Sequence, residues 1–222
     1  MKRREFAAGM GASALGLGLS APVLAQRQPV EGQQFKRLAT PVPTNAPGKI
    51  EVLEFFWYGC PHCYIFEPYI EDWAKKLPAD VVFRKVHVAF RANVKQHQKM
   101  FYALDALGLE ARARPAIFAG LQSQGLALDT PKAMADFLGP LGVDPQKFQS
   151  AFNSFGVAAK CQQAERLSEA YRIEGVPTVA IQGRFVTAPS LHQIQQQRVS
   201  EQVLAQSTLQ TMDALIRQVR GK

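Results

Sequence analysis

Runs of apolar residues divide the chain into strand-like and helix-like segments. Residues 50–57 form an apolar run with the length of a buried strand, and the segment from Cys60 to about Lys76 has apolar side chains at helical spacing. A second strand pattern covers residues 81–90. This β-α-β order predicts two parallel strands joined by a right-handed crossover.

The pattern is helical throughout from residue 92 to about residue 172. Pro131 and Pro145 follow Thr130 and Asp144, which are good N-cap residues, so each proline predicts the start of a new helix. A helical block between two strand regions predicts an α/β chain. The block is either an inserted helical subdomain or a separate domain.

Strand patterns return after the helical block. Residues 176–181 and 184–186 flank the turn residues Gln182-Gly183 and predict a hairpin. A last helix carries one apolar face, made by Leu209, Met212, Leu215, Ile216 and Val219.

The N-terminal 25 residues have the pattern of an export signal. Residues 1–4 are basic, residues 6–24 are apolar, and residues 23–25 fit a cleavage site. The pair Arg3-Arg4 partly matches a twin-arginine signal, so both this and the general export route stay open. Glycines and a proline interrupt the apolar stretch, which favours cleavage over a membrane anchor. We therefore predict a mature protein soluble in the periplasm, where disulfides persist.

Residues 26–48, between the signal and the first long strand, are predicted to form a leader and an edge strand. Residues 26–34 are predicted to be disordered, residues 35–40 to form a short edge strand, and the proline-rich residues 41–48 to form a loop. With 222 residues, the chain has the length of one domain, with or without an insertion.

The formal net charge is +8, and about +6 without the signal. The basic residues are spread along the chain, and no basic helix is interleaved with aromatic residues. We therefore expect a solvated surface and no nucleic-acid partner, although attraction to anionic lipid head groups stays open.

Cys60-Pro61-His62-Cys63 is the motif that carries chemistry. It lies between the first long strand and a helix, and Pro61 suits the first helical turn. The helix N-terminus and His62 favour a thiolate at Cys60, which we expect to be exposed and to have a low pKa. Cys63, one turn into the helix, is expected to be shielded and to react second. A stabilised thiolate favours the reduced protein and so makes the disulfide a stronger oxidant.

Two other interpretations of the cysteines are weaker. A zinc site lacks a second pair of ligands, because Cys161 is single and the remaining histidines are scattered. A purely structural disulfide would close a very small loop and gain little stability. We expect no metal and no cofactor other than the Cys60–Cys63 disulfide. Cys161 is predicted to be a buried, unreactive thiol, with intermolecular pairing left open.

The motif and its surroundings resemble the DsbA family of thiol-disulfide oxidoreductases. The resemblance is carried by Val52-Leu53-Glu54-Phe55-Phe56, by residues 60–64, and by Gly175-Val176-Pro177-Thr178, which resembles the cis-proline loop of that family. It covers the chain from about Phe35 to the C-terminus. It implies a thioredoxin-like fold over residues 49–91 and 172–222, with residues 92–171 as an inserted all-helical subdomain.

The resemblance also assigns roles to residues near the motif. It implies that Pro177 is cis and lies opposite the two cysteines, with the Val176 backbone free to pair with an extended substrate. It implies a buried acid at Glu54 and, less firmly, a partner lysine at Lys85 on the following strand.

Glu54 is unusual on its residue pattern as well. A carboxylate inside an apolar strand is costly to bury in the charged form, so we expect a raised pKa and a role as proton acceptor for Cys63. The alternative is a glutamate that faces solvent at a strand edge. Trp57 and Tyr58, just before the motif, are predicted to form a partly exposed apolar lip that binds unfolded chains, with a place in the core as the alternative.

These features predict a periplasmic dithiol oxidase that donates the Cys60–Cys63 disulfide to reduced, unfolded secreted proteins. The resemblance implies reoxidation by a DsbB-type membrane quinone reductase, and we expect a monomer. A disulfide isomerase or reductase is the enzymatic alternative, but residues 26–49 are too short for the dimerisation domain of such isomerases. A chaperone or binding module without redox chemistry is the alternative of another class.

Overall fold

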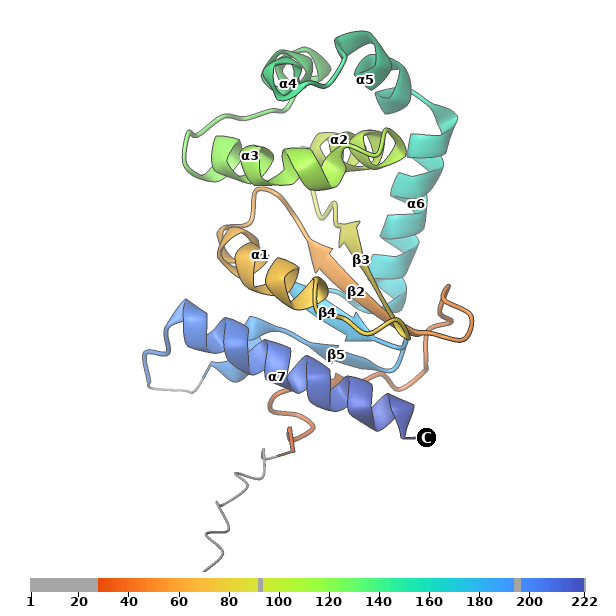
Figure 1. Ribbon diagram of the computed structural model, residues 1–222, viewed down its shortest axis with the longest axis vertical. Helices are drawn as coiled ribbons and strands as arrows, with labels where there is room; N and C mark the ends of the chain where they lie inside the picture. The colour runs from red at the N-terminus through yellow and green to blue at the C-terminus, as the bar shows by residue number, and fades with distance from the viewer. Residues whose placement is uncertain (1–27, 92–93, 194–196, 222) are drawn as a thin grey trace, which may run out of the picture.

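The computed structural model describes residues 28–91, 94–193 and 197–221. A mixed five-stranded sheet lies beside a block of helices, and its strand order is β1-β5-β4-β2-β3 (Figure 1). The strands are β1 (Lys36–Arg37), β2 (Ile50–Phe56), β3 (Val81–His87), β4 (Thr178–Ile181) and β5 (Phe185–Thr187). The helices are α1 (Pro61–Ala74), α2 (Val94–Ala106), α3 (Glu110–Gln122), α4 (Pro131–Leu138), α5 (Pro145–Phe152), α6 (Phe155–Ala170) and α7 (Glu201–Arg220), with short 3-10 turns at Gly139–Leu141 and Pro189–His192.

The predicted β-α-β unit is confirmed. β2 and β3 are parallel, with Ile50 opposite Val81 and Phe56 opposite His87, and α1 connects them. Every residue of β2 is buried, because the strand is central and has helices on both sides. This burial explains why the sequence of β2 is a nearly continuous apolar run.

The hairpin between β4 and β5 is also confirmed. Its two turn residues have left-handed backbones, with φ of 51° at Gln182 and 61° at Gly183. Glycine is required at the second position for a further reason, because a Cβ there would lie 1.8 Å from the carbonyl oxygen of Val42. The hairpin therefore also holds the loop that precedes β2.

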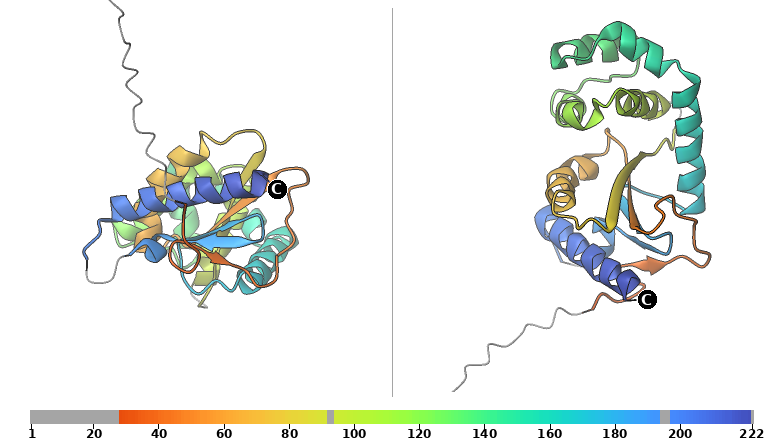
Figure 2. Two further views of the ribbon diagram at one scale, coloured as in Figure 1. Left: turned by 90° about the horizontal axis from the view of Figure 1, so that it is seen from below. Right: turned by 45° about the vertical axis from the view of Figure 1, so that its right-hand side comes forward.

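Helices cover both faces of the sheet. α1 and α7 lie together on one face, and the C-terminal end of α6 reaches the other (Figure 2). On the first face, Val52, Phe66, Ile70 and Met212 belong to one buried apolar cluster. On the second, the ring of Tyr171, which follows α6, lies 5.3 Å from the ring of Phe55.

The helical block contains α2 to α6, so the fold is the predicted thioredoxin-like α/β fold with a helical insertion between β3 and β4. The predicted helix starts are confirmed, since Thr130 Oγ1 accepts from the Ala133 N–H and Asp144 Oδ1 accepts from the Lys147 N–H. Side chains of the block and of the sheet share one apolar core, which includes Phe55, Met100, Leu104, Phe118 and Phe148.

Some predicted boundaries are wrong. β3 ends at His87 rather than residue 90, and β4 begins at Thr178 rather than residue 176. Residues 28–34, expected to be disordered, include a turn in which the Gly32 N–H donates to the Phe35 carbonyl. The predicted signal lies outside the described residues. Within the described ranges, no helix combines the length and apolar character needed to cross a membrane.

Candidate active site

The two cysteines lie at the start of α1. Cys60 is the N-cap residue, Pro61 occupies the first helical turn, and the Cys60 N–H donates to the Trp57 carbonyl at 3.0 Å. Both cysteines are free thiols in the structure. Cys63 is completely buried, as expected. Cys60 is less exposed than predicted, with 8% of its surface accessible, so only a narrow approach to its sulfur remains.

The surroundings of Cys60 favour the thiolate. Its pKa is lowered to about 6, chiefly by a hydrogen bond from the Cys63 side chain, and further by the backbone N–H groups of Cys63 and His62. These N–H groups belong to the first turn of α1, where they have no partner within the helix. Burial and the hydrogen bond to Cys60 raise the pKa of Cys63 well above its usual value. Near neutral pH, Cys60 is therefore favoured as a thiolate and Cys63 as a thiol.

His62 has a smaller part in this than the sequence suggested. Its positive charge is the last of the causes that lower the pKa of Cys60, after its own backbone N–H. The imidazole side chain is 64% exposed, and its Nδ1 lies 3.1 Å from Oε1 of Glu201 at the start of α7. Solvent and Glu201 both weaken the effect of an imidazolium charge on the sulfur.

The loop before β4 lies against Cys60. The Val176–Pro177 peptide bond is cis, as the family resemblance implies. The Sγ of Cys60 lies 3.3 Å from the carbonyl oxygen of Val176, to which it can donate when it is protonated. Residues more than one hundred positions apart in the chain are thus brought into direct contact at the reactive sulfur.

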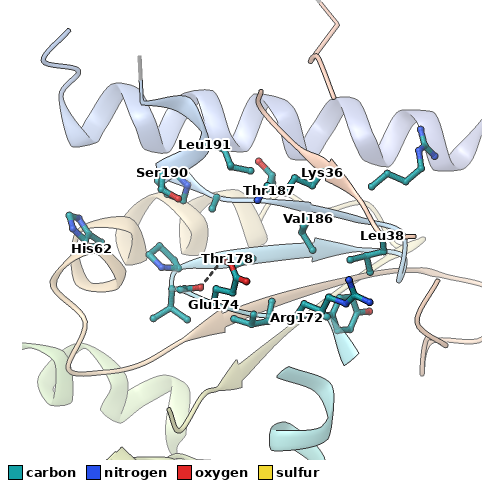
Figure 3. Close-up of a pocket in the computed structure, with 18 of the residues that line it drawn as sticks. Lys36, Leu38, His62, Arg172, Glu174, Thr178, Val186, Thr187, Ser190 and Leu191 are labelled. Atoms are coloured by element: carbon teal, nitrogen blue, oxygen red, sulfur yellow. Dashed lines mark hydrogen bonds between the residues drawn. The ribbon is translucent and has the colours of Figure 1, made fainter. Parts of the chain in front are cut away.

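A groove of about 830 Å³ has Val176 and Pro177 in its wall, next to Cys60. It runs from His62 and Ser190 past Thr178, Val186 and Thr187 toward Leu38 and Arg172 (Figure 3). Its walls come from the β4–β5 hairpin, the segment around β1, the end of α6 and the start of α7. The groove is large enough for several residues of an extended chain.

Glu54 and Lys85 form a buried ion pair behind the cysteines. They face each other in the β2–β3 register, and Lys85 Nζ donates to Glu54 Oε2. The Glu54 side chain is fully buried, which excludes the solvent-facing alternative. Burial raises its pKa to about 7 despite the attraction of Lys85. Lys85 stays protonated, because Glu54 and Glu67 more than offset the effect of burial and keep its pKa above the usual value.

This pair belongs to a larger cluster that the sequence analysis missed. Glu67 of α1 lies 2.8 Å from Lys85 and 3.0 Å from Arg114 of α3, which also binds Glu71 and Glu110. Two sequence signals pointed to it. Glu67 follows Cys63 by four residues and therefore lies on the same face of α1. Arg114 follows Glu110 by four residues in α3, which is the spacing of an ion pair on a helix. The cluster connects the active-site helix to the helical block.

Of the two predicted lip residues, only Trp57 is partly exposed. Tyr58 is completely buried, and its hydroxyl donates to Glu110 Oε1 at 2.6 Å. The predicted exposure of Tyr58 is therefore wrong. Tyr58 lies in the turn between β2 and α1, and its ring packs 5.3 Å from the ring of Phe118 in α3, so it enters the helical block.

Cys161 lies on α6, in the helical block. It is half-buried rather than fully buried, and its environment raises the pKa of its thiol to about 11, mainly through burial. A thiol with a raised pKa is a poor nucleophile near neutral pH. Among the described residues, no group of three or more His, Cys, Asp or Glu side chains is arranged to hold a metal ion.

Comparison with known proteins gives one consistent family. Residues 51–198 match the model of the DSBA-like thioredoxin domain. The chain is 45% identical over 212 residues to the thiol:disulfide interchange protein DsbA of Burkholderia cepacia, covering 94% of this chain and 95% of that protein. It is 44% identical over 154 residues to DsbA of Pseudomonas aeruginosa, covering 69% and 73% of the two chains.

Solved structures agree with these sequence matches. The crystal structure of Pseudomonas aeruginosa DsbA superposes with a TM-score of 0.79 at 39% identity, over 86% of this chain and 94% of that one. Oxidoreductase DsbA of Xylella fastidiosa superposes with a TM-score of 0.76 at 27% identity, over 87% and 99%. The similarity thus includes both the sheet and the helical insertion.

Proposed function

Because the chain belongs to the DsbA family of thiol:disulfide interchange proteins, we propose that it donates the Cys60–Cys63 disulfide to reduced, unfolded proteins exported to the periplasm. It is a thiol-disulfide oxidoreductase of the dithiol oxidase type. The observation that carries the direction of the reaction is the low pKa of Cys60, about 6, beside a Cys63 thiol that holds its proton. A stable Cys60 thiolate favours the reduced enzyme, so electrons flow from the substrate to the pair.

The reaction begins with the oxidised pair. A substrate thiolate attacks Sγ of Cys60, the Cys60–Cys63 bond breaks, and Cys63 leaves as a thiolate that takes up a proton. A second substrate thiolate then attacks the substrate sulfur of the mixed disulfide and releases Cys60 as a thiolate. The substrate loses two electrons and gains a disulfide, and the enzyme ends as the Cys60/Cys63 dithiol. No further cofactor takes part in these steps.

Glu54 is proposed to exchange the proton of Cys63. A carboxyl group with a pKa of about 7 can give and take a proton near neutral pH, and its charge already acts on the pKa of Cys63. Lys85 acts on the reaction only through Glu54, by holding that side chain in place from the adjacent strand.

Substrate is proposed to bind along the groove beside Cys60. The Val176 carbonyl, whose oxygen lies 3.3 Å from the Cys60 sulfur, would accept a backbone N–H of an extended substrate. Pro177 lines the same end of the groove, and the partly exposed ring of Trp57 would add apolar contact near the reactive sulfur. Binding through main-chain groups suits an enzyme that accepts many sequences.

The proposal extends to location and partners. The basic and apolar N-terminal residues support export with a cleaved signal, and a DsbB-type membrane quinone reductase would reoxidise the pair. The scattered basic residues argue against a nucleic-acid partner, and we further propose that the protein acts as a monomer.

An oxidation assay tests the function. A reduced, unfolded protein with two cysteines is mixed with the oxidised enzyme, and formation of its disulfide is followed as free thiols disappear. Wild type and a Cys161→Ser control should oxidise the substrate at equal rates, whereas Cys60→Ser should be inactive. Equal activity of Cys60→Ser and wild type would contradict the proposal. A strongly reducing equilibrium with glutathione would instead favour a reductase.

A further inference from the structure

Among the described residues, three side-chain hydrogen bonds join the helical block to the segment that precedes the cysteines. His97 of α2 binds the indole of Trp57, and Gln122 of α3 donates to the Tyr58 carbonyl at 2.9 Å. Glu110 of α3 accepts from the Tyr58 hydroxyl. Of these, the His97 contact is the one that holds a ring lying directly over Gly59.

His97 must be neutral to make its two hydrogen bonds. Its Nδ1 lies 3.1 Å from the Nε1 of Trp57, and its Nε2 lies 2.8 Å from the carbonyl oxygen of Ala127. An indole N–H can only donate and a carbonyl can only accept, so Nε2 carries the proton and Nδ1 is bare. The side chain is almost fully buried, and this burial keeps its pKa below the ordinary value. Imidazole is thus the acceptor that fixes the orientation of the indole.

The Trp57 ring in turn lies against the active-site loop. A Cβ added at Gly59 would come within 2.3 Å of this ring, so the ring occupies the space where a side chain of residue 59 would lie. The Trp57 backbone contacts both cysteines, since its carbonyl accepts from the Cys60 N–H and a backbone hydrogen bond from Trp57 favours the Cys63 thiolate. A continuous chain of contacts therefore joins His97 to both sulfurs.

We infer that His97 is a positioning residue for the Cys60–Cys63 pair. By holding the Trp57 ring over Gly59, it fixes the turn that presents Cys60 at the start of α1. The inference rests on the proposed redox function and adds to it, because it gives the helical block a direct part in setting the redox equilibrium. When the indole loses its acceptor, the turn loosens, the thiolate is less stabilised, and the equilibrium shifts toward the disulfide.

Two amide substitutions separate the two hydrogen bonds of His97. The Oδ1 of asparagine can take the place of Nδ1 and accept from Trp57, whereas the amide of glutamine reaches the place of Nε2 and can donate to Ala127. We expect His97→Gln to shift the equilibrium constant with glutathione about fivefold toward the disulfide, which is about 20 mV. His97→Asn should stay within about twofold of wild type, or about 9 mV.

Trp57→Phe provides a second route, because it removes the N–H donor together with the Cε2, Cζ2 and Cη2 atoms that lie over Gly59. Alone it should shift the constant at least about fivefold toward the disulfide, and adding His97→Gln to it should cause no further shift. In an NMR spectrum the two indole N–H signals are assigned with Trp73→Phe. The Trp57 signal should move in His97→Gln and stay near its wild-type position in His97→Asn.

The outcomes are distinct. If His97→Gln and His97→Asn give equal shifts, if Trp57→Phe leaves the constant unchanged, or if the double variant is additive, the inference is wrong. Unfolding in urea shows whether each variant is folded, and the Trp57→Phe comparison decides the matter even if both His97 variants are unstable. If the equilibrium of wild type with glutathione is strongly reducing, the proposed oxidase function is wrong. The differences in this equilibrium constant between the variants and wild type test the role of His97 alone.

Discussion

Replacing Glu54 with glutamine should stabilise the protein, and the gain should depend on pH. The substitution keeps the size and one hydrogen-bonding oxygen of the side chain but removes its charge. Glu54 is fully buried. Its Oε2 accepts a hydrogen bond from Lys85, whereas its Oε1 has no hydrogen-bond partner among the described residues. The charged form is therefore disfavoured in the folded protein, as its raised pKa indicates.

The magnitude follows from the shift in pKa. The pKa rises from 4.5 to about 7 on folding, and each unit corresponds to 1.36 kcal/mol, so ionised Glu54 lowers the free energy of unfolding by about 3 kcal/mol. Between these two pKa values the folded state holds a proton that the unfolded state has lost. The contribution of Glu54 to the free energy of unfolding of wild type therefore falls as the pH rises from 4.5 to about 7. Above that range the full loss of about 3 kcal/mol is present. Glutamine has no such dependence.

The assay is urea unfolding of the reduced protein at about pH 5 and about pH 8. The free energy of unfolding of Glu54→Gln should exceed that of wild type by about 1 kcal/mol at the lower pH and by about 3 kcal/mol at the higher one. Glu169→Gln, at an exposed position of α6, is the control and should show no pH-dependent difference. A Glu54→Gln difference that is independent of pH, or that decreases as pH rises, would refute this reasoning.

Three further outcomes test separate parts of the structure. Thr130→Ala should lower the free energy of unfolding by about 1 kcal/mol in urea, because the Ala133 N–H loses its cap, and an equal loss in Thr130→Ser would contradict this. Tyr58→Phe should cost about 1 to 3 kcal/mol in the same assay, since Glu110 loses a buried donor, and a negligible loss would show that water replaces the hydroxyl. Cys161→Ser should leave the equilibrium constant with glutathione unchanged, whereas a shift would show that this thiol takes part.

Much of the fold could be predicted from local patterns. The buried run of β2, the helix after Cys60 and the proline-marked starts of α4 and α5 depend on residues close together in the chain, and all were predicted. The end of β3 and the start of β4 were misplaced, because apolar residues lie in the chain directly after β3 and directly before β4.

The site was predictable only where a motif marks it. The cysteines, Pro61 and the pair Glu54 and Lys85 lie where the sequence placed them, the last because the parallel register puts them opposite each other. The burial of Tyr58 was not foreseen, because it depends on a partner in the helical block at Glu110.

The contacts of Arg114 and His97 were missed for the same reason. Both connect the active-site segment to helices of the block, and the spacing of Glu110 and Arg114 in α3 does not show which element that pair packs against. The positions that could not be predicted are thus those where two distant elements supply complementary charges or hydrogen-bonding groups.

Titration of the Cys60 thiolate tests the electrostatic basis of the proposed oxidase most directly. The ultraviolet absorbance of the reduced protein is followed against pH, with Cys60→Ser subtracted to remove the contribution of the other thiols. We predict a transition centred at about 6, well separated from any absorbance due to Cys161, whose pKa is about 11. A single transition near the ordinary thiol value of 9.0 would mean that the start of α1 does not stabilise the thiolate, and the preference for the reduced enzyme would lose its cause.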